Sequence, residues 1–348
     1  MYKLLIRPLL FYFQPETIHH FVGSALKMGF KIPFVKPLVT SVLKVKHPSL
    51  ERTVFGIKFE NPVGIAAGFD KKANLYDELY SMGFSHVEIG TITPKPQDGN
   101  PQPRSFRIPQ DKGLINRMGF NNYGCEHAKK SLKQKKSKVI IGGNIGKNTL
   151  TPNELALQDY ETTFRGLFSS VDYFVVNVSC PNVTNLRELQ DQEKLFAILS
   201  RLQDINNKEM PKRKPILLKV SPDLNTKQLD EVITLVKRTQ IDGVVATNTT
   251  VSRNGLNTNS SRIEQIGNGG MSGAPIRERS TEVIRYLAEK SNKGFAIIGV
   301  GGIFTAKDAI EKLEAGADLI QVYTGFIYEG PVIARKINKA ILKNISNQ

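Results

Sequence analysis

Eight apolar, β-type segments separated by helical patterns constrain the fold of this chain more than any other feature. Each segment is short and continuous, which is typical of a parallel strand that is buried on both faces. The segments are 63–67, 87–92, 139–145, 173–178, 216–220, 243–247, 296–300 and 319–322. Eight βα units over about 270 residues favour an α/β fold with a closed (β/α)8 TIM barrel, whose usual length is about 250 residues. An open, doubly wound sheet is the competing fold.

Length and composition limit the class of protein before any motif is considered. The 348 residues are enough for one barrel domain with an appendage. Cys125 and Cys180 are the two cysteines, and without a signal-peptide pattern we expect a reducing compartment and no disulfide framework. The 48 basic and 32 acidic residues give a net charge of +16. Such a charge suits nucleic acid, an anionic membrane surface or an anionic small substrate.

Residues 1–50 are basic and apolar, and we expect them to form an N-terminal helical extension of a catalytic domain at 51–348. Seven Lys or Arg residues and a single acid, Glu16, leave a charge of +6 there. Prolines break the apolar runs, and none reaches the roughly 18 residues of a spanning helix. Short, basic, amphipathic helices fit an anionic membrane surface. A helical pair packed on the main domain, or a dimer contact, is the alternative.

The other basic cluster consists of six lysines between Lys129 and Lys138. It contains no interleaved aromatic residues, on which bases could stack. We therefore interpret it as a solvated helix end and expect no nucleic-acid partner.

Polar and small residues gather where the predicted strands end. The fourth strand runs into Asn-Val-Ser-Cys-Pro-Asn at 177–182, and the third ends in Gly-Gly-Asn at 142–144. The last three strands end in Thr-Asn-Thr at 247–249, Gly-Gly at 301–302 and Tyr-Thr-Gly at 323–325. Because the carboxyl ends of barrel strands form the active face, this pattern predicts an enzyme site.

Glycines after the last two strands predict a site for a phosphorylated cofactor. Their backbone N–H groups can approach a phosphate, and the helix that Thr305 caps would add its N-terminus. Lys219, inside the fifth strand, is a second signal, because an ammonium in a barrel interior is costly unless it meets an anion or a polar ring. A lysine that leans out of the barrel mouth to water is the alternative.

Local patterns predict three further features. Residues 53–59, with Gly56 in the middle, indicate a small hairpin that closes the barrel floor. Thr151 and Glu154 form a capping-box pattern with Pro152 at the first helical position. Thr305 and Asp308 repeat the capping-box pattern without proline.

Six motifs in one order carry a resemblance that spans nearly the whole chain. They are Ala-Ala-Gly-Phe-Asp-Lys at 66–71, Asn-Arg-Met-Gly-Phe-Asn-Asn at 116–122, Asn-Val-Ser-Cys-Pro-Asn at 177–182, Ala-Thr-Asn-Thr-Thr at 246–250, Gly-Met-Ser-Gly at 270–273 and Ile-Gly-Val-Gly-Gly-Ile at 298–303. With them the chain resembles a dihydroorotate dehydrogenase of the membrane-associated, quinone-using class. The resemblance implies an FMN-dependent barrel that oxidises (S)-dihydroorotate to orotate in de novo pyrimidine biosynthesis and passes the electrons to a membrane quinone.

The same resemblance implies where the protein acts and which residues take part. The extension would give the quinone access and attach the protein peripherally to the cytoplasmic side of the cell membrane. FMN would be held by Ala67, Gly68, Thr91, Asn144, Asn177, Lys219, Thr247, Gly273, Gly302, Tyr323 and Thr324. The substrate would be held by Lys71, Asn116, Arg117, Met118, Gly119, Phe120, Asn182, Asn248 and Thr249. No metal is implied.

Cys180 differs from the pattern of the class that the chain resembles. The quinone-using members usually have serine at this position, whereas the soluble members have cysteine. The resemblance implies that this residue removes the C5 proton of the substrate. A thiol, with an ordinary pKa of about 8.5, is a better base near neutrality than the hydroxyl of the adjacent Ser179. A small buried cysteine without chemistry is the alternative.

The mixture of a soluble-class cysteine and a membrane-class extension leaves other functions open. The first is a soluble dihydroorotate dehydrogenase that uses fumarate or a partner flavoprotein. An FMN-dependent tRNA dihydrouridine synthase and a non-catalytic membrane adaptor are more distant alternatives.

Overall fold

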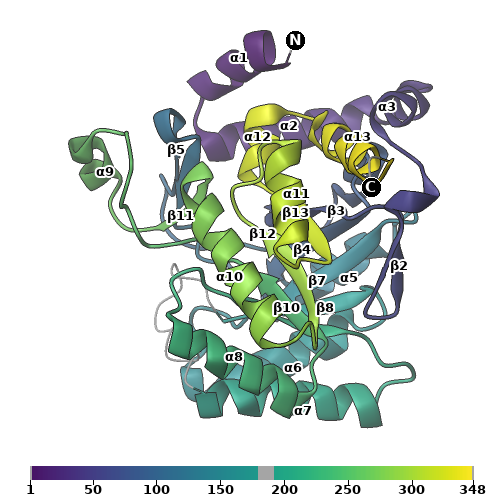
Figure 1. The fold of residues 1–348 in the computed structure, drawn as a ribbon, viewed down its shortest axis with the longest axis vertical. Helices are drawn as coiled ribbons and strands as arrows, with labels where there is room; N and C mark the ends of the chain where they lie inside the picture. The colour runs from purple at the N-terminus through teal and green to yellow at the C-terminus, as the bar shows by residue number, and fades with distance from the viewer. Residues whose placement is uncertain (1, 179–191, 347–348) are drawn as a thin grey trace.

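The computed structural model describes residues 2–178 and 192–346 and contains a closed barrel of eight parallel strands (Figure 1). The strands are β3 (Val63–Asp70), β4 (His86–Ile92), β7 (Ile140–Ile145), β8 (Tyr173–Asn177), β9 (Ile216–Val220), β10 (Gly243–Ala246), β12 (Ala296–Val300) and β13 (Leu319–Val322). Neighbouring strands follow the order of the chain, and β13 closes the ring on β3. The predicted (β/α)8 barrel is confirmed, and the open sheet is excluded.

Helices alternate with the strands and cover the outside of the barrel. They are α4 (Tyr76–Ser81), α5 (Gly124–Leu132), α6 (Ala156–Leu167), α7 (Gln192–Lys208), α8 (Thr226–Thr239), α10 (Arg277–Lys290), α11 (Ala306–Glu314), α12 (Thr324–Glu329) and α13 (Ile333–Ser346). One apolar cluster packs between strands and helices, while a second, which includes Tyr173, Val175 and Leu217, fills the barrel interior. Burial on both faces explains why the strands are continuously apolar.

The two predicted capping boxes have different outcomes. Thr305 caps α11, because its side chain accepts from the N–H of Asp308 and the Asp308 carboxylate accepts from the N–H of Thr305. The prediction at Thr151 is wrong. There the chain forms a 3-10 turn at Asn153–Leu155, and α6 begins only at Ala156.

The predicted hairpin is present and covers the amino ends of the barrel strands. It consists of β1 (Arg52–Val54) and β2 (Ile57–Phe59), which pair antiparallel. The ring of Phe59 lies 5.3 Å from that of His86, and Phe55 lies 5.5 Å from Tyr173. Aromatic side chains therefore seal the barrel floor.

A second small sheet was not predicted from the sequence. It joins β5 (Ser105–Ile108), β6 (Gly113–Asn116) and β11 (Gly270–Gly273) in the order β11-β6-β5. All its strand pairs are antiparallel. The short helix α9 (Ser260–Ile266) precedes β11 and projects from the barrel in Figure 1. This sheet brings the 116–122 and 270–273 motifs together.

The N-terminal extension is helical, as expected. A short π-helical turn (Tyr2–Ile6) leads into α1 (Arg7–Tyr12), α2 (Pro15–Gly29) and α3 (Val35–Leu43), which lie beside α12 and α13 in Figure 1. Tyr2 donates to the carbonyl of Ile327 at 2.6 Å, and Arg104 binds Glu16 through two of its nitrogens. No helix within 2–178 or 192–346 is long and apolar enough to cross a membrane.

Candidate active site

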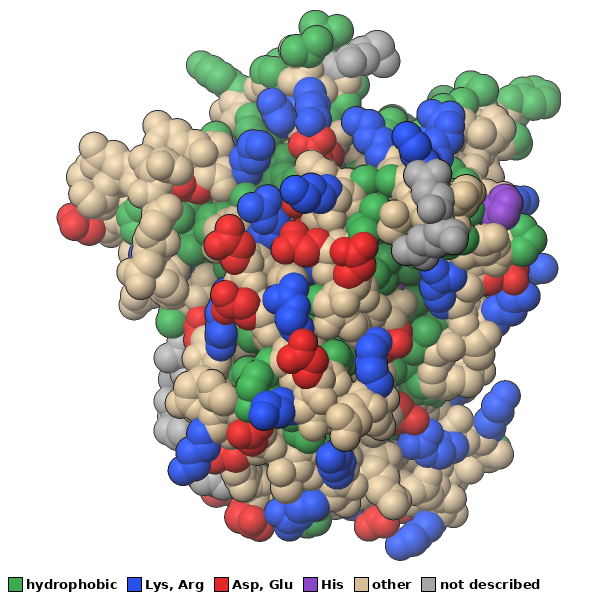
Figure 2. Space-filling model, viewed as in Figure 1, with side chains coloured by type: hydrophobic (Ala, Val, Ile, Leu, Met, Phe, Trp, Pro, Cys, Tyr) green, Lys and Arg blue, Asp and Glu red, His purple; other side chains and the backbone are tan. Residues whose placement is uncertain are grey.

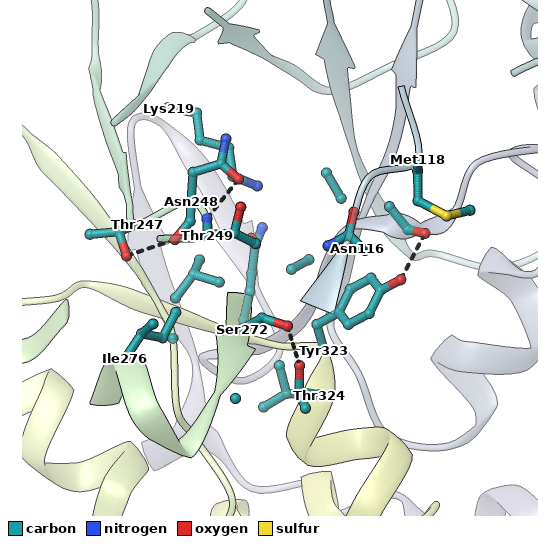
Figure 3. Close-up of a pocket in the computed structure, with 18 of the residues that line it drawn as sticks. Asn116, Met118, Lys219, Thr247, Asn248, Thr249, Ser272, Ile276, Tyr323 and Thr324 are labelled. Atoms are coloured by element: carbon teal, nitrogen blue, oxygen red, sulfur yellow. Dashed lines mark hydrogen bonds between the residues drawn. The ribbon is translucent and has the colours of Figure 1, made fainter. Parts of the chain in front are cut away.

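A cavity opens at the carboxyl ends of the barrel strands, and segments that are far apart in the chain meet around it. Its wall combines the strand ends with residues of β6 and β11. The predicted residues that line it are Ala67, Gly68, Lys71, Thr91, Asn116, Met118, Gly119, Phe120, Asn177, Lys219, Thr247, Asn248, Thr249, Gly273, Gly302, Tyr323 and Thr324. In Figure 3, Thr247 and Asn248 lie on the opposite side of the cavity from Met118.

Side-chain amides are linked through hydrogen bonds at the base of this cavity. Asn177 donates from Nδ2 to the hydroxyl of Thr91 at 3.1 Å and to Oδ1 of Asn144 at 3.3 Å. Asn248 donates in turn to Oδ1 of Asn177 at 3.4 Å. Because each amide is held by its neighbours, their remaining donors and acceptors are fixed in direction and suit a polar ring.

Lys219 lines the cavity and is almost fully buried, with 6% of its side chain exposed. The alternative that it leans out to water is therefore wrong. Its ammonium lies 3.6 Å from a carboxylate oxygen of Glu88, a fully buried residue of β4. A buried ammonium needs an anion or a polar ring beside it, and Glu88 of the protein itself is such an anion.

Glycines at the ends of β12 and β13 allow the backbone to pack too closely for any side chain. A Cβ at Gly302, whose φ is +69°, would lie 2.3 Å from Cβ of Arg277. A Cβ at Gly325 would lie 1.8 Å from the carbonyl oxygen of Ile303. Both glycines and Thr324 line the cavity, and backbone N–H groups and a hydroxyl are suitable donors to a phosphate.

The helix that Thr305 caps does not contribute to this part of the cavity. The carboxylate of Asp308 already accepts from the backbone N–H groups of Phe304 and Thr305. Among the described residues, none between Ile303 and Gln321 lines the cavity, so α11 does not border it. The expectation that the N-terminus of α11 strengthens a phosphate site was wrong.

Lys71 lines the cavity together with Asn116 and Asn121. Its Nζ donates to Oδ1 of Asn121 at 2.8 Å, and Asn116 donates to the carbonyl of Gly270 at 3.4 Å. A cation next to amide groups is the arrangement that a small carboxylate with ring amides requires.

Two predicted residues lie away from the cavity, and two lie outside the described residues. The guanidinium of Arg117 donates to the carbonyls of Ile266 and Asn268, at 2.5 Å and 2.9 Å, and so belongs to the α9 loop. Asn144 lies behind the lining and supports Thr91, whose hydroxyl donates to its Oδ1 at 2.6 Å. Cys180 and Asn182 are the two that lie outside the described residues.

Several lining residues were missed. Asn121 and Ser272 belong to the motifs at 116–122 and 270–273, and the hydroxyl of Ser272 lies 2.8 Å from that of Thr324 (Figure 3). Gln321 also lines the cavity, from within a buried strand. Its signal, like that of Glu88, was a polar residue inside an apolar strand, the same signal that drew attention to Lys219.

A second cavity lies between α2 and the barrel and adjoins the first, because Gly68, Lys71 and Tyr323 line both. The ring of His19 on α2 packs edge-on against Phe69 at 4.9 Å. Burial, followed by the charge of Lys71, lowers the pKa of His19 to about 4, so its imidazole is neutral at pH 7. Burial raises the pKa of Tyr323 to about 12, so its hydroxyl keeps its proton.

Comparison with known proteins places the chain in a family. The profile of the family described as Dihydroorotate dehydrogenase matches residues 49–345. The chain is 57% identical, over 99% of both chains, to the Dihydroorotate dehydrogenase (quinone) of Christiangramia forsetii, and 44% identical to that of Thermosynechococcus vestitus, over 98% of this chain and 96% of the relative. It therefore belongs to the dihydroorotate dehydrogenase family of oxidoreductases.

The same conclusion follows from solved structures. The crystal structure of the Eimeria tenella enzyme in complex with ferulenol superimposes with a TM-score of 0.86 at 34% identity, and the match covers 96% of this chain and 92% of that one. The ligand-free Eimeria tenella enzyme gives the same TM-score and identity, over 96% of this chain and 95% of that chain.

Proposed function

We propose that this protein oxidises (S)-dihydroorotate to orotate in de novo pyrimidine biosynthesis, with FMN in the barrel cavity and a membrane quinone as the final acceptor. One observation carries the proposal: a buried lysine, a set of fixed amides and a glycine-lined cradle surround a single cavity. Membership in the family supports the reaction.

The cavity fits FMN on the chemistry of its donors. The family depends on a flavin. Backbone N–H groups near Gly273, Gly302 and Thr324 would bind the phosphate, while Asn177 and Lys219 would bind the ring. Bound FMN supplies a hydride acceptor for dihydroorotate and an electron donor for the quinone. Lys219 places a positive charge where negative charge develops on reduction.

Lys71, Asn116 and Asn248 would bind the substrate. The ammonium of Lys71 would pair with the carboxylate, and the two asparagines would match the amides of the ring. Cys180 follows β8 in the sequence, and we assign to it the removal of the C5 proton. Removal of that proton by a positioned side chain is general base catalysis.

The second cavity would hold the quinone. It adjoins the first at Tyr323, and its α2 side presents a neutral His19 and an ion pair of Glu16 with Arg104. An uncharged imidazole is compatible with an apolar quinone body. The Tyr323 hydroxyl, which donates to the carbonyl of Gly68 at 3.3 Å, stays neutral beside it.

The extension would lie on the membrane surface. Its exposed apolar side chains include Leu4, Leu5, Leu9, Phe13, Phe21, Met28, Ile32, Phe34 and Leu38. Figure 2 shows such side chains over α1 and over α3, with lysines and arginines nearby. Apolar side chains flanked by basic groups are typical of a peripheral anchor on the anionic, cytoplasmic leaflet.

Orotate formation with different electron acceptors tests the proposal. We expect turnover of dihydroorotate with a short-chain quinone and little turnover with fumarate. Arg104→Leu should raise the KM for quinone while leaving anaerobic flavin reduction by dihydroorotate at its wild-type rate, because Arg104 lines the second cavity. Turnover with fumarate alone would favour the alternative, a soluble dihydroorotate dehydrogenase that uses fumarate.

Binding to lipid vesicles tests the membrane attachment separately. The double variant Leu5→Ser/Leu9→Ser should bind anionic vesicles at least about tenfold more weakly, because each buried apolar side chain contributes about 1.5–3 kcal/mol. Both leucines are more than half exposed, so folding should be unaffected. Equal binding of variant and wild type would contradict the attachment.

A further inference from the structure

A buried carboxylate, that of Glu88, lies behind the cavity and has no role in the proposed binding of FMN, substrate or quinone. Glu88 is in the middle of β4 and is fully buried. A buried carboxylate needs paired donors or a counter-charge to compensate for the loss of water. Side chains from three other strands supply these.

The partners of Glu88 converge from around the barrel. Asn144 on β7 donates to its Oε1 at 2.7 Å, and Gln321 on β13 donates to its Oε2 at 2.8 Å. The ammonium of Lys219 on β9 lies 3.6 Å from Oε1. Since β13 and β9 lie on opposite sides of β4 in the ring, the carboxylate occupies the barrel interior.

The partners divide into two layers. Lys219 and Gln321 line the cavity, whereas Glu88 and Asn144 lie one layer deeper. The carboxylate of Glu88 therefore attracts the ammonium of Lys219 from the side away from the cavity. The amides of Asn144 and Gln321 fix the position of that carboxylate. At the same time it offsets part of the positive charge that Lys219 presents to the cavity, and in a buried site this offset is weakly screened.

We propose that Glu88 is a positioning residue that holds the ammonium of Lys219 at the base of the cavity. By its negative charge, Glu88 also lowers the reduction potential of the bound flavin. The inference rests on the proposed FMN site. A flavin gains negative charge on reduction, so Lys219 favours reduction and Glu88 opposes it. The pair would thus set a potential between those that either charge alone would give.

The reduction potential of the FMN-loaded protein, measured in equilibrium with a dye of known potential and without dihydroorotate or quinone, tests the inference. Glu88→Gln keeps the size of the side chain and an acceptor for Asn144, but it removes the charge. We expect the equilibrium constant for two-electron reduction to rise about tenfold, which is about 30 mV. The control Glu282→Gln removes an exposed carboxylate on α10 and should leave the constant unchanged.

The same substitution made in a Lys219→Met protein shows whether Glu88 changes the equilibrium constant for reduction through Lys219 or independently of it. Lys219→Met should lower the constant. In the Lys219→Met background, Glu88→Gln should change the constant less than about twofold, because there is then no ammonium for Glu88 to hold or to offset. Should Glu88→Gln fail to fold, Glu88→Asp decides, since its shorter side chain withdraws the carboxylate and should raise the constant two- to threefold.

Three results would overturn the inference. They are an unchanged or lower constant in Glu88→Gln, an unchanged constant in Glu88→Asp, and an equal effect of Glu88→Gln with and without Lys219. If the wild-type protein bound no flavin, the FMN site and the inference would fail together. If flavin bound normally and the potential did not move, the inference alone would fail.

Discussion

The two ends of the barrel are built from the same eight strands but differ in chemistry. At the amino ends, His86 and Tyr173 are fully buried against the aromatic hairpin of β1 and β2. At the carboxyl ends, Lys219, Asn177 and a glycine cradle surround a cavity. The floor is packed with buried aromatic side chains and serves stability, whereas the mouth keeps polar groups that stability alone would not select. Changes at each end should therefore have different consequences.

The largest effect is expected from Cys180, which follows β8 in the sequence. Cys180→Ala should lower kcat by roughly 10²–10⁴-fold, the usual contribution of a general base, with little change in thermal stability. Cys180→Ser should move the pH dependence of kcat to higher pH.

The other cysteine provides the control. Cys125 is buried on α5, and burial raises the pKa of its thiol to about 11, so it is not a base at neutral pH. Cys125→Ala should keep the wild-type kcat. Full activity of Cys180→Ser from pH 6 to 9 would remove the special role of the thiol.

The next largest effect concerns the floor. Phe59→Ala should lower the free energy of unfolding by about 3–5 kcal/mol, because Phe59 is fully buried between Phe55 and His86. The turnover of the molecules that remain folded should not change. Lys58→Ala, on the exposed face of the same strand, should change stability by less than about 0.5 kcal/mol. A loss of kcat in Phe59→Ala at a temperature where it is folded would contradict the division between floor and mouth.

A smaller effect is expected at the cradle. Gly302→Ala should weaken FMN binding by about 1–3 kcal/mol, roughly 5- to 150-fold in Kd, because the added Cβ collides with Arg277. Gly255→Ala has a similar φ, +72°, but its Cβ meets nothing within 4 Å. Gly255→Ala therefore introduces the backbone strain without the collision. Equal FMN affinities in the two variants would show that the close packing around Gly302 does not matter for FMN binding.

The smallest effect is the pH dependence of the floor. Burial lowers the pKa of His86 to about 3, whereas an unfolded histidine has a pKa of about 6.5. Between these values the unfolded chain binds more protons, so stability falls as pH falls. From pH 7 to pH 5, His86 should account for about 2 kcal/mol of lost unfolding free energy. The unfolding free energy measured at pH 7 and pH 5 should show no such loss in His86→Leu. The loss should be unchanged in His127→Gln, which removes an exposed imidazole.

Much of the floor and the mouth could be predicted from the sequence, because buried parallel strands have a continuous apolar pattern and polar residues at their ends stand out against it. The hairpin was recognisable from Gly56, which has a φ of +78°. The small sheet was not, since β6 and β11 are four residues long and pair across about 150 residues of chain. Arg117 was assigned with its motif, but a motif does not say which way a side chain points.

The layer behind the cavity was the other part that sequence reasoning missed. Glu88 and Gln321 acquire their importance from partners on other strands, and those contacts exist only in the closed barrel. Lys219 gave the same kind of signal and was noticed because its charge is difficult to bury. A systematic search for polar residues inside the predicted strands would have found all three.

Anaerobic mixing of dihydroorotate with the FMN-loaded protein tests the central claim, that the mouth of the barrel carries the chemistry. The flavin absorbance should bleach in a single turnover with one orotate formed per flavin, and Cys180→Ala should slow bleaching while Phe59→Ala should not. No bleaching of the wild-type flavin, or equal slowing by both variants, would contradict the account.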